Sequence, residues 1–147
     1  MKKINRLVSI IIRTKNEERW IKSCLESIKF QTYKNYEIII VDNNSNDKTL
    51  EICKKYKVKK ITKINKFLPG KALNLGIKYS KGYYIVCISA HCIPYDKFWL
   101  MNLVKSIEEN DEYAGAYGRQ VPMSFSSNAN KRDLITVFGL DKKIQSK

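Results

Sequence analysis

The regular alternation of two kinds of segment is the feature that most constrains the fold of this sequence. Short runs rich in β-branched residues, typical of strands, lie at residues 7–12, 36–41, 58–64, 83–88 and 113–117. Between them lie segments whose apolar residues recur at helical spacing. This β-α-β-α-β-α-β-α-β order predicts an α/β fold with an open, mostly parallel sheet flanked by helices.

Several of the expected helices have recognisable ends. Asn16 precedes two acidic residues and is expected to cap a helix that ends near Gln31. Pro69 opens a later helix, which Gly82 is expected to end. A helix is expected after the polar loop at residues 42–47, with Leu50, Ile52, Cys53 and Tyr56 facing inward, and the remaining helices are expected at 98–107 and 133–138. Residues 38–41 are apolar at every position, which is typical of a parallel strand covered on both faces.

Polar residues follow three of the expected strands, at residues 13–17, 42–45 and 89–91. Ligands of open α/β sheets bind outside the carboxyl ends of the strands, so we expect these groups to converge on one crevice. Asp42 can accept a hydrogen bond from a base N–H or a ribose hydroxyl, or it can brace its own loop. Arg13 and Lys15 stand where a phosphate or a base carbonyl would approach, unless they are ordinary exposed charges.

A further cation lies near the start of the helix at Pro69. Lys71 combines a positive charge with a helix N-terminus, a pairing that suits phosphate, and Asn74 lies about one turn further on. An ordinary surface position is the alternative for both residues. The sequence has no Gly-x-Gly-x-x-Gly after its first strand, no P-loop motif and no Gly-x-Ser-x-Gly. These absences argue against a dinucleotide-binding fingerprint, a P-loop hydrolase and an α/β-hydrolase.

The chain carries a formal net charge of +14 over 147 residues, a balance that attracts polyanions. No helix-turn-helix, zinc-finger or RNP signature accompanies the charge, so nucleic acid is not the expected partner. Four cysteines lie in apolar segments without a Cys-x-x-Cys pair, and neither a signal peptide pattern nor an apolar stretch of about 18 residues is present. We therefore expect a cytoplasmic protein with reduced thiols, whose basic surface contacts the anionic inner face of the cell membrane.

Two long stretches carry a family resemblance. "VSIIIRTKNEERWIKSCLESIKFQTYKNYEIIIVDNNSNDKT" and "GKALNLGIKYSKGYYIVCISAH" resemble the N-terminal, nucleotide-sugar-binding half of glycosyltransferase family 2 enzymes, which have the Rossmann-like GT-A fold. "GRQVP" and "RDLITVFG" resemble a bacterial subset that builds surface polysaccharides. The resemblance implies an inverting transfer of a sugar from a nucleotide-sugar donor to a saccharide or lipid-linked acceptor.

The resemblance also implies roles for individual residues. The residues expected to face the base and ribose are Thr14, Lys15, Glu17 and Asp42, with Asn44 in the same acidic loop. Lys71 and Asn74 are expected near the ribose and diphosphate. Residues 89–91 fall on the family's Asp-x-Asp motif, whose final acid usually ligates a divalent metal.

Both acids of that motif are missing, since Ser89 and His91 stand in their places. Ser89 can still reach a ribose hydroxyl. His91 has three open interpretations: a ligand to manganese through an imidazole nitrogen, a direct contact with the diphosphate, or a structural residue. A divalent metal, manganese or magnesium, is therefore expected, but the replacement of both acids puts it in question.

The resemblance divides the chain into a donor-binding α/β domain at residues 1–120 and the start of an acceptor half, or a tail, at 121–147. The general base of the family is expected beyond Lys147, which predicts a fold truncated before the acceptor half. A catalytically incomplete nucleotide-binding module is the alternative function. The sugar, the nucleotide, the acceptor and the oligomeric state stay open.

Overall fold

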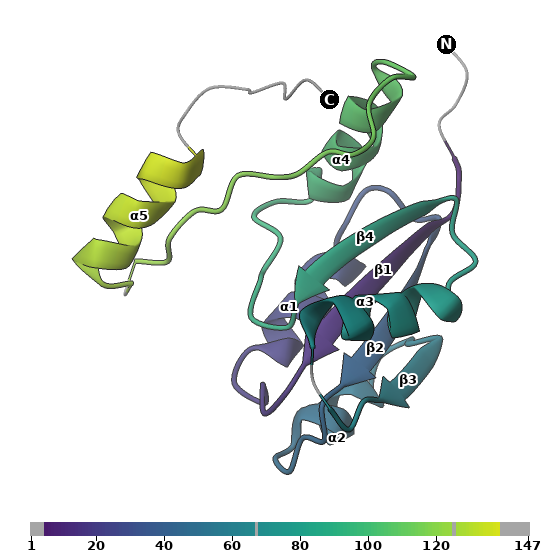
Figure 1. Cartoon of the computed structure of the whole chain (residues 1–147), viewed down its shortest axis with the longest axis vertical. Coiled ribbons are helices and arrows are strands. Elements are labelled where there is room, and N and C mark those ends of the chain that lie inside the picture. The colour runs from purple at the N-terminus through teal and green to yellow at the C-terminus, as the bar shows by residue number, and fades with distance from the viewer. Residues whose placement is uncertain (1–4, 67, 125, 139–147) are drawn as a thin grey trace.

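The computed structural model describes residues 5–66, 68–124 and 126–138. Four strands form its sheet: β1 (Val8–Thr14), β2 (Tyr36–Asp42), β3 (Lys60–Lys63) and β4 (Tyr84–Ser89). Their order is β3-β2-β1-β4, and every pairing is parallel. The prediction of an open parallel α/β sheet flanked by helices is confirmed (Figure 1).

Helices cover both faces of the two central strands. The helices are α1 (Ile21–Lys29), α2 (Thr49–Cys53), α3 (Pro69–Lys78), α4 (Trp99–Glu108) and α5 (Asn128–Phe138). On one face the even-numbered apolar residues of β1 and β2 pack with buried side chains of α1, α2 and α4. On the other face Ile11, Ile39 and Val41 pack against Ala72 of α3. The central strands are therefore apolar at successive positions because each of their faces is buried.

Glycine lets α3 lie close to the sheet. A Cβ atom at Gly76 would come within 2.4 Å of the Ile11 side chain. Gly82 was expected to end α3, and that prediction is wrong, because the helix ends at Lys78. A Cβ atom at Gly82 would instead lie 2.4 Å from the backbone nitrogen of Ser9, so this glycine serves the close approach of the chain to the start of β1.

Three further predictions about elements differ from the structure. Asn16 does not cap α1: the helix begins at Ile21, and Asn16 has a φ of 52°. Residues 113–117 do not form a fifth strand. Residues 114–121 are all exposed, so no buried contact holds them in an extended ladder. The last described helix, α5, begins at Asn128 rather than at residue 133, and the Ser127 hydroxyl accepts the backbone N–H of Asn130 at 3.2 Å, near its start.

The division of the chain at residue 120 stays a prediction. Residues 139–147, the end of the predicted second segment, lie outside the described residues. Among the helices that are described, none combines the length and the apolar character needed to cross a bilayer.

Candidate functional site

The carboxyl ends of β1, β2 and β4 meet at one edge of the sheet. Thr14 pairs with Asp42 across β1 and β2, and Arg13 pairs with Ser89 across β1 and β4. Arg13, Thr14, Asp42 and Ser89 are therefore strand residues in fixed register rather than loop residues. The predicted convergence of three polar groups is present in the backbone.

Two loops at this edge hold each other. The loop latch, as we name it, consists of residues 16–18 after β1 and residues 45–49 after β2. Its hydrogen bonds run from Asn16 N to Ser45 Oγ (2.9 Å), Glu17 N to Thr49 Oγ1 (2.7 Å), Glu18 N to Asp47 Oδ2 (3.0 Å), Asn46 N to Asn16 Oδ1 (2.9 Å) and Lys48 N to Glu18 Oε2 (2.9 Å). Because the bonds run in both directions, neither loop can move without breaking contacts to the other.

Left-handed backbone accompanies the latch on both sides. Asn16 has a φ of 52° and Asn44 a φ of 51°. Asparagine tolerates this region better than most residues, which explains its presence in both turns. The sequence did not reveal the latch, because serine, threonine, asparagine and aspartate serve equally as local helix caps.

Hydrogen bonding holds the Asp47 carboxylate in its ionised form. Its Oδ1 accepts the Thr49 N–H at 2.9 Å and its Oδ2 accepts the Glu18 N–H. Desolvation alone would raise the pKa of Asp47, but the hydrogen bonds with Thr49 and Glu18 outweigh it and lower the pKa below its ordinary value of 3.8. The latch is therefore complete at neutral pH.

Asp42 is fully buried and braces its own loop. One of its oxygens accepts the backbone N–H of Ser45 at 3.0 Å, and the other accepts the Ser45 hydroxyl. The loop-bracing interpretation of Asp42 thus has a structural basis. Each carboxylate oxygen has a further lone pair, so a contact with a base or ribose stays a prediction.

The guanidinium of Arg13 lies at this edge, and not all of its hydrogen-bond donors are paired within the described residues. Its Nη2 donates to Ser89 Oγ at 3.0 Å. Its Nε is buried without a hydrogen-bond partner among the described residues, and so is Thr14 Oγ1. Buried donors without partners are rare in folded proteins and mark positions where a ligand or water completes the bonding. Arg13 and Thr14 are successive residues of β1, so their side chains lie on opposite faces of the sheet, both at its carboxyl end.

His91 meets Glu17 across the same edge. Its Nδ1 lies 2.7 Å from Glu17 Oε1, although the residues are 74 positions apart in the sequence. The loop that carries His91 is fixed by a bond from Ala90 N to Arg13 O at 3.0 Å, and Ala90 itself is fully buried. The structure therefore links both departures from the Asp-x-Asp motif to the first strand and its loop: Ser89 to Arg13, and His91 to Glu17.

The other predicted residues lie at the surface. Lys15 is exposed, and Asn44 donates a long 3.4 Å hydrogen bond to Asn65. Lys71 and Asn74 are exposed on α3, and the side chain of neither makes a hydrogen bond or ion pair with another described residue. The parallel strand β3 ends at the carboxyl edge of the sheet, and α3 begins after five intervening residues. The N-terminus of α3, with Lys71, therefore lies near this edge, on the sheet face that also carries Arg13 and Ser89. Their contacts with a ligand stay predictions.

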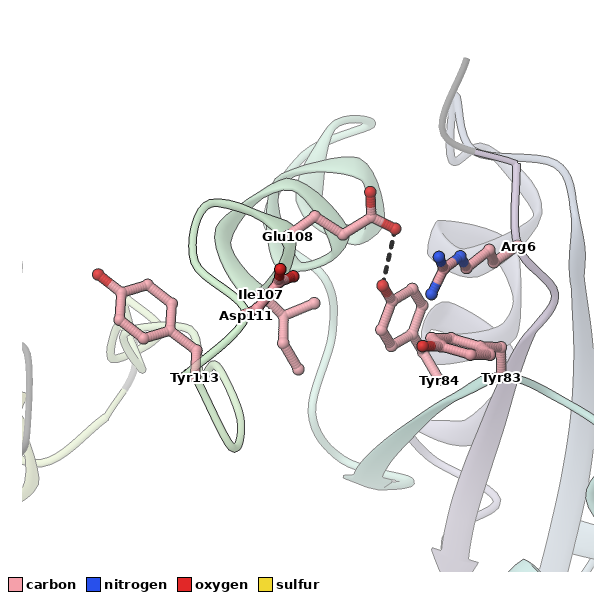
Figure 2. A pocket seen from close by; sticks show the side chains of 7 residues that line it. All are labelled: Arg6, Tyr83, Tyr84, Ile107, Glu108, Asp111 and Tyr113. Carbon is pink, nitrogen blue, oxygen red and sulfur yellow. Dashed lines mark hydrogen bonds between the residues drawn. The ribbon is translucent and has the colours of Figure 1, made fainter. Parts of the chain in front are cut away.

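Two cavities lie elsewhere. The first, of about 220 Å³, is at the amino-terminal edge of the sheet, between Arg6, the start of β4 and the end of α4 (Figure 2). Two contacts join side chains of its lining: Tyr84 donates to Glu108 at 2.7 Å, and the Arg6 guanidinium lies 4.0 Å from the Tyr83 ring centre. Burial, together with the Glu108 carboxylate, raises the pKa of Tyr84 to about 12. Ligands of open α/β sheets bind at the opposite edge, outside the carboxyl ends of the strands.

The second cavity, of about 240 Å³, lies along α4 beside residues 116–119. Aromatic side chains, among them Tyr95, Trp99 and Tyr117, line it. None of the predicted site residues lines either cavity.

The sequence and the fold are similar to those of known proteins. The sequence model of a family described as "Glycosyl transferase family 2" matches residues 9–144. A relative from Methanococcus voltae is 39% identical over 104 residues, which are 65% of this chain and 32% of that protein; it is named a dolichyl N-acetyl-α-D-glucosaminyl phosphate 3-β-D-2,3-diacetamido-2,3-dideoxy-β-D-glucuronosyltransferase. The chain thus spans about a third of the length of this relative.

Solved structures agree with the fold. TarS 1–349 of S. aureus in complex with UDP-GlcNAc superposes with a TM-score of 0.64 at 28% identity, covering 80% of this chain and 37% of that chain. The mannosyltransferase PcManGT of Pyrobaculum calidifontis, solved with GDP-Man and Mn²⁺, superposes with a TM-score of 0.64 at 24% identity, covering 68% of this chain and 32% of that chain. Because the family match spans most of the sequence and the parallel sheet is shared, the chain belongs to glycosyltransferase family 2 and has the GT-A fold.

Proposed function

We propose that this chain is the donor-binding part of a glycosyltransferase that moves a sugar from a nucleotide-sugar to a saccharide or lipid-linked acceptor, in the synthesis of a cell-surface polysaccharide. The observation that carries the proposal is the convergence of Arg13, Asp42, Ser89 and the Glu17–His91 pair on the carboxyl edge of a parallel sheet. The names of the similar proteins support it: one acts on a dolichyl phosphate sugar, and TarS holds UDP-GlcNAc.

Each residue has a proposed task. Asp42, Thr14, Lys15 and Asn44 hold the base and ribose, and Ser89 offers its hydroxyl to the ribose. Lys71, at a helix N-terminus, and Asn74 lie near the diphosphate. Arg13 donates to a phosphate oxygen through its guanidinium, which is always charged and presents donors in a fixed fork.

The reaction proposed is a single displacement with inversion. The acceptor hydroxyl attacks the anomeric carbon, the bond to the diphosphate breaks, and the nucleoside diphosphate leaves. A general base takes the hydroxyl proton. We assign this base to none of the described residues, and the family resemblance places it after the donor half. A nucleotide-binding module without catalysis is the second candidate.

The donor set of the site fits a divalent metal through one protein ligand. The described residues contain no cluster of three metal-binding side chains. Metal ions that act on phosphates usually take only one or two protein ligands, and phosphate oxygens and water supply the rest. His91 has one ring nitrogen engaged by Glu17 and a side chain that is 57% exposed. We propose that His91 holds manganese, which neutralises the charge of the leaving diphosphate when it is bound.

We place the reaction on the cytoplasmic side of the cell membrane. All four cysteines, each within the described residues, are free thiols, and burial raises the pKa of Cys24 to about 12 and that of Cys53 to about 11. Free thiols, of which Cys24 and Cys53 are buried, suit a reducing compartment. The net charge of +14 suits contact with an anionic membrane face that presents a lipid-linked acceptor.

Isothermal titration calorimetry with UDP, GDP, TDP and CMP, with and without manganese, tests the proposal. We expect one nucleotide to bind at least about ten-fold more tightly than the others, with an affinity that salt changes little. Binding of all four with equal affinity and a steep salt dependence would indicate phosphate binding of the nucleic-acid type instead. A product assay with the matching nucleotide-sugar then separates a transferase from a binding module.

A further inference from the structure

We infer that Glu17 is a positioning residue for His91 and not a nucleotide contact: it holds the imidazole with its hydrogen on Nδ1 and leaves Nε2 bare for a metal. The inference rests on the proposed function for the identity of the ligand. The arrangement of the Glu17 and His91 side chains is independent of the proposed function, because the structure shows it directly.

The contact has the geometry of an oriented imidazole. Nδ1 of His91 lies 2.7 Å from Glu17 Oε1, the distance of a charge-assisted hydrogen bond. An ionised carboxylate can only accept, so the ring nitrogen that faces it carries the hydrogen. In a neutral imidazole the other nitrogen, Nε2, then has a free lone pair. Histidines that bind metals usually have their second ring nitrogen engaged in this way by a carboxylate.

Backbone hydrogen bonds hold the segments that carry Glu17 and His91 in place. The backbone nitrogen of Glu17 donates to Thr49 Oγ1 at 2.7 Å within the loop latch, and the Glu17 side chain is only 18% exposed. His91 follows Ala90, which is fully buried and bonded to Arg13 O. The carboxylate therefore comes from a fixed turn, so it can set the orientation of the ring rather than follow it.

The exposure of His91 argues against a purely structural role. Its side chain is 57% exposed, and Nε2 has no hydrogen-bond partner among the described residues. Contacts between a charged and a polar side chain at such exposure contribute little to folding. The main effect of the Glu17 contact is therefore to fix the orientation and the tautomer of the imidazole ring. A bare, accessible Nε2 at the Asp-x-Asp position offers one ligand where the family has an acid.

The chain contains one histidine, so its ring signals in NMR need no assignment by mutation. We would label histidine with ¹⁵N and read the tautomer at about pH 8, where an ordinary imidazole is neutral. The wild type should show Nδ1 protonated and Nε2 bare. Glu17→Ala should shift the population toward the Nε2–H form that free histidine favours. Glu17→Gln keeps a carbonyl acceptor and should fall between them.

The matched control is Glu51→Gln, because Glu51 is an exposed acid of α2 that pairs with Lys55. It should leave the histidine spectrum unchanged. A wild-type spectrum with Nε2 protonated would overturn the inference. So would a tautomer population that is the same in the wild type and in Glu17→Ala.

Manganese supplies a second readout that needs no turnover. In the presence of UDP or GDP, Mn²⁺ should broaden the His91 ring signals of the wild type. Its affinity, measured by electron paramagnetic resonance, should be about 10- to 100-fold lower in Glu17→Ala. Metal-free nucleotide affinity should stay within about two-fold of the wild type. If that affinity falls while the tautomer is unchanged, Glu17 contacts the nucleotide and the inference is wrong. If neither nucleotide binds while the tautomer shifts as expected, the proposed donor site fails and the positioning of His91 stands.

Discussion

Replacing Asp47 by alanine should loosen the loop latch and reduce both stability and nucleotide affinity. The Asp47 carboxylate accepts the N–H groups of Glu18 and Thr49, so its loss removes two bonds at once. A hydrogen bond of this kind contributes about 0.5–1.5 kcal/mol to the unfolding free energy, so the loss of two should be measurable. We expect nucleotide affinity to fall about ten-fold as well, because Lys15, proposed to hold the base and ribose, and the adjoining backbone of residues 16–18 lose their fixed positions. Urea unfolding and calorimetry measure the two effects.

The pH dependence of unfolding separates the role of the Asp47 carboxylate in the loop latch from the effect of simply removing a negative charge. The pKa of Asp47 is lowered in the folded state, so its contribution is present above the ordinary value of 3.8 and is lost as the pH falls through the folded-state pKa. The Asp47→Ala variant should lack this part of the acid-induced loss of stability. Glu51→Gln, on the exposed side of α2, is the control and should retain it. If Asp47→Ala has the nucleotide affinity of the wild type, the latch does not shape the site.

Replacing Arg13 by methionine should lower nucleotide affinity without lowering stability. A charge-assisted hydrogen bond to phosphate contributes about 1.5–3 kcal/mol, so affinity should fall about 10- to 100-fold. In the free protein, the Arg13 Nε is buried without a partner among the described residues. Such a group costs about 1–3 kcal/mol, so the free energy of unfolding should stay the same or rise.

The control for Arg13 is Arg132→Met on the exposed surface of α5, which removes the same charge away from the strand ends. It should change neither quantity. An Arg13→Met protein that is less stable than the wild type but binds nucleotide equally well would assign Arg13 a structural role through its bond to Ser89.

Local patterns predicted the framework of this molecule. Periodicity predicted the strands β1 and β2 and the amphipathic helices. The spacing of apolar residues along an element shows which of its faces is buried. The prediction of a strand at residues 113–117 was wrong because it also rested on a local pattern alone. The composition of this segment favours a strand, but nothing in the described structure covers it.

Contacts between distant segments were beyond the reach of sequence reasoning. Asn16 has the residue type of a helix cap, yet its side chain bonds Asn46 across the latch. Local and cross-loop bonding use the same residue types, so the sequence cannot distinguish them. Likewise, no spacing rule connects Glu17 to His91 over 74 positions. The resemblance placed both residues at the site, and only the fold showed that they touch.

Nucleotide titration of the ¹⁵N-labelled chain, followed by two-dimensional NMR, tests the central claim most directly. With the nucleotide that calorimetry selects, we expect the largest shift changes at residues 13–17, 42–47 and 89–91, the carboxyl edge of β1, β2 and β4. Shift changes concentrated instead around Arg6, Tyr84 and Glu108, or along α4 beside residues 116–119, would contradict a donor site at the strand ends.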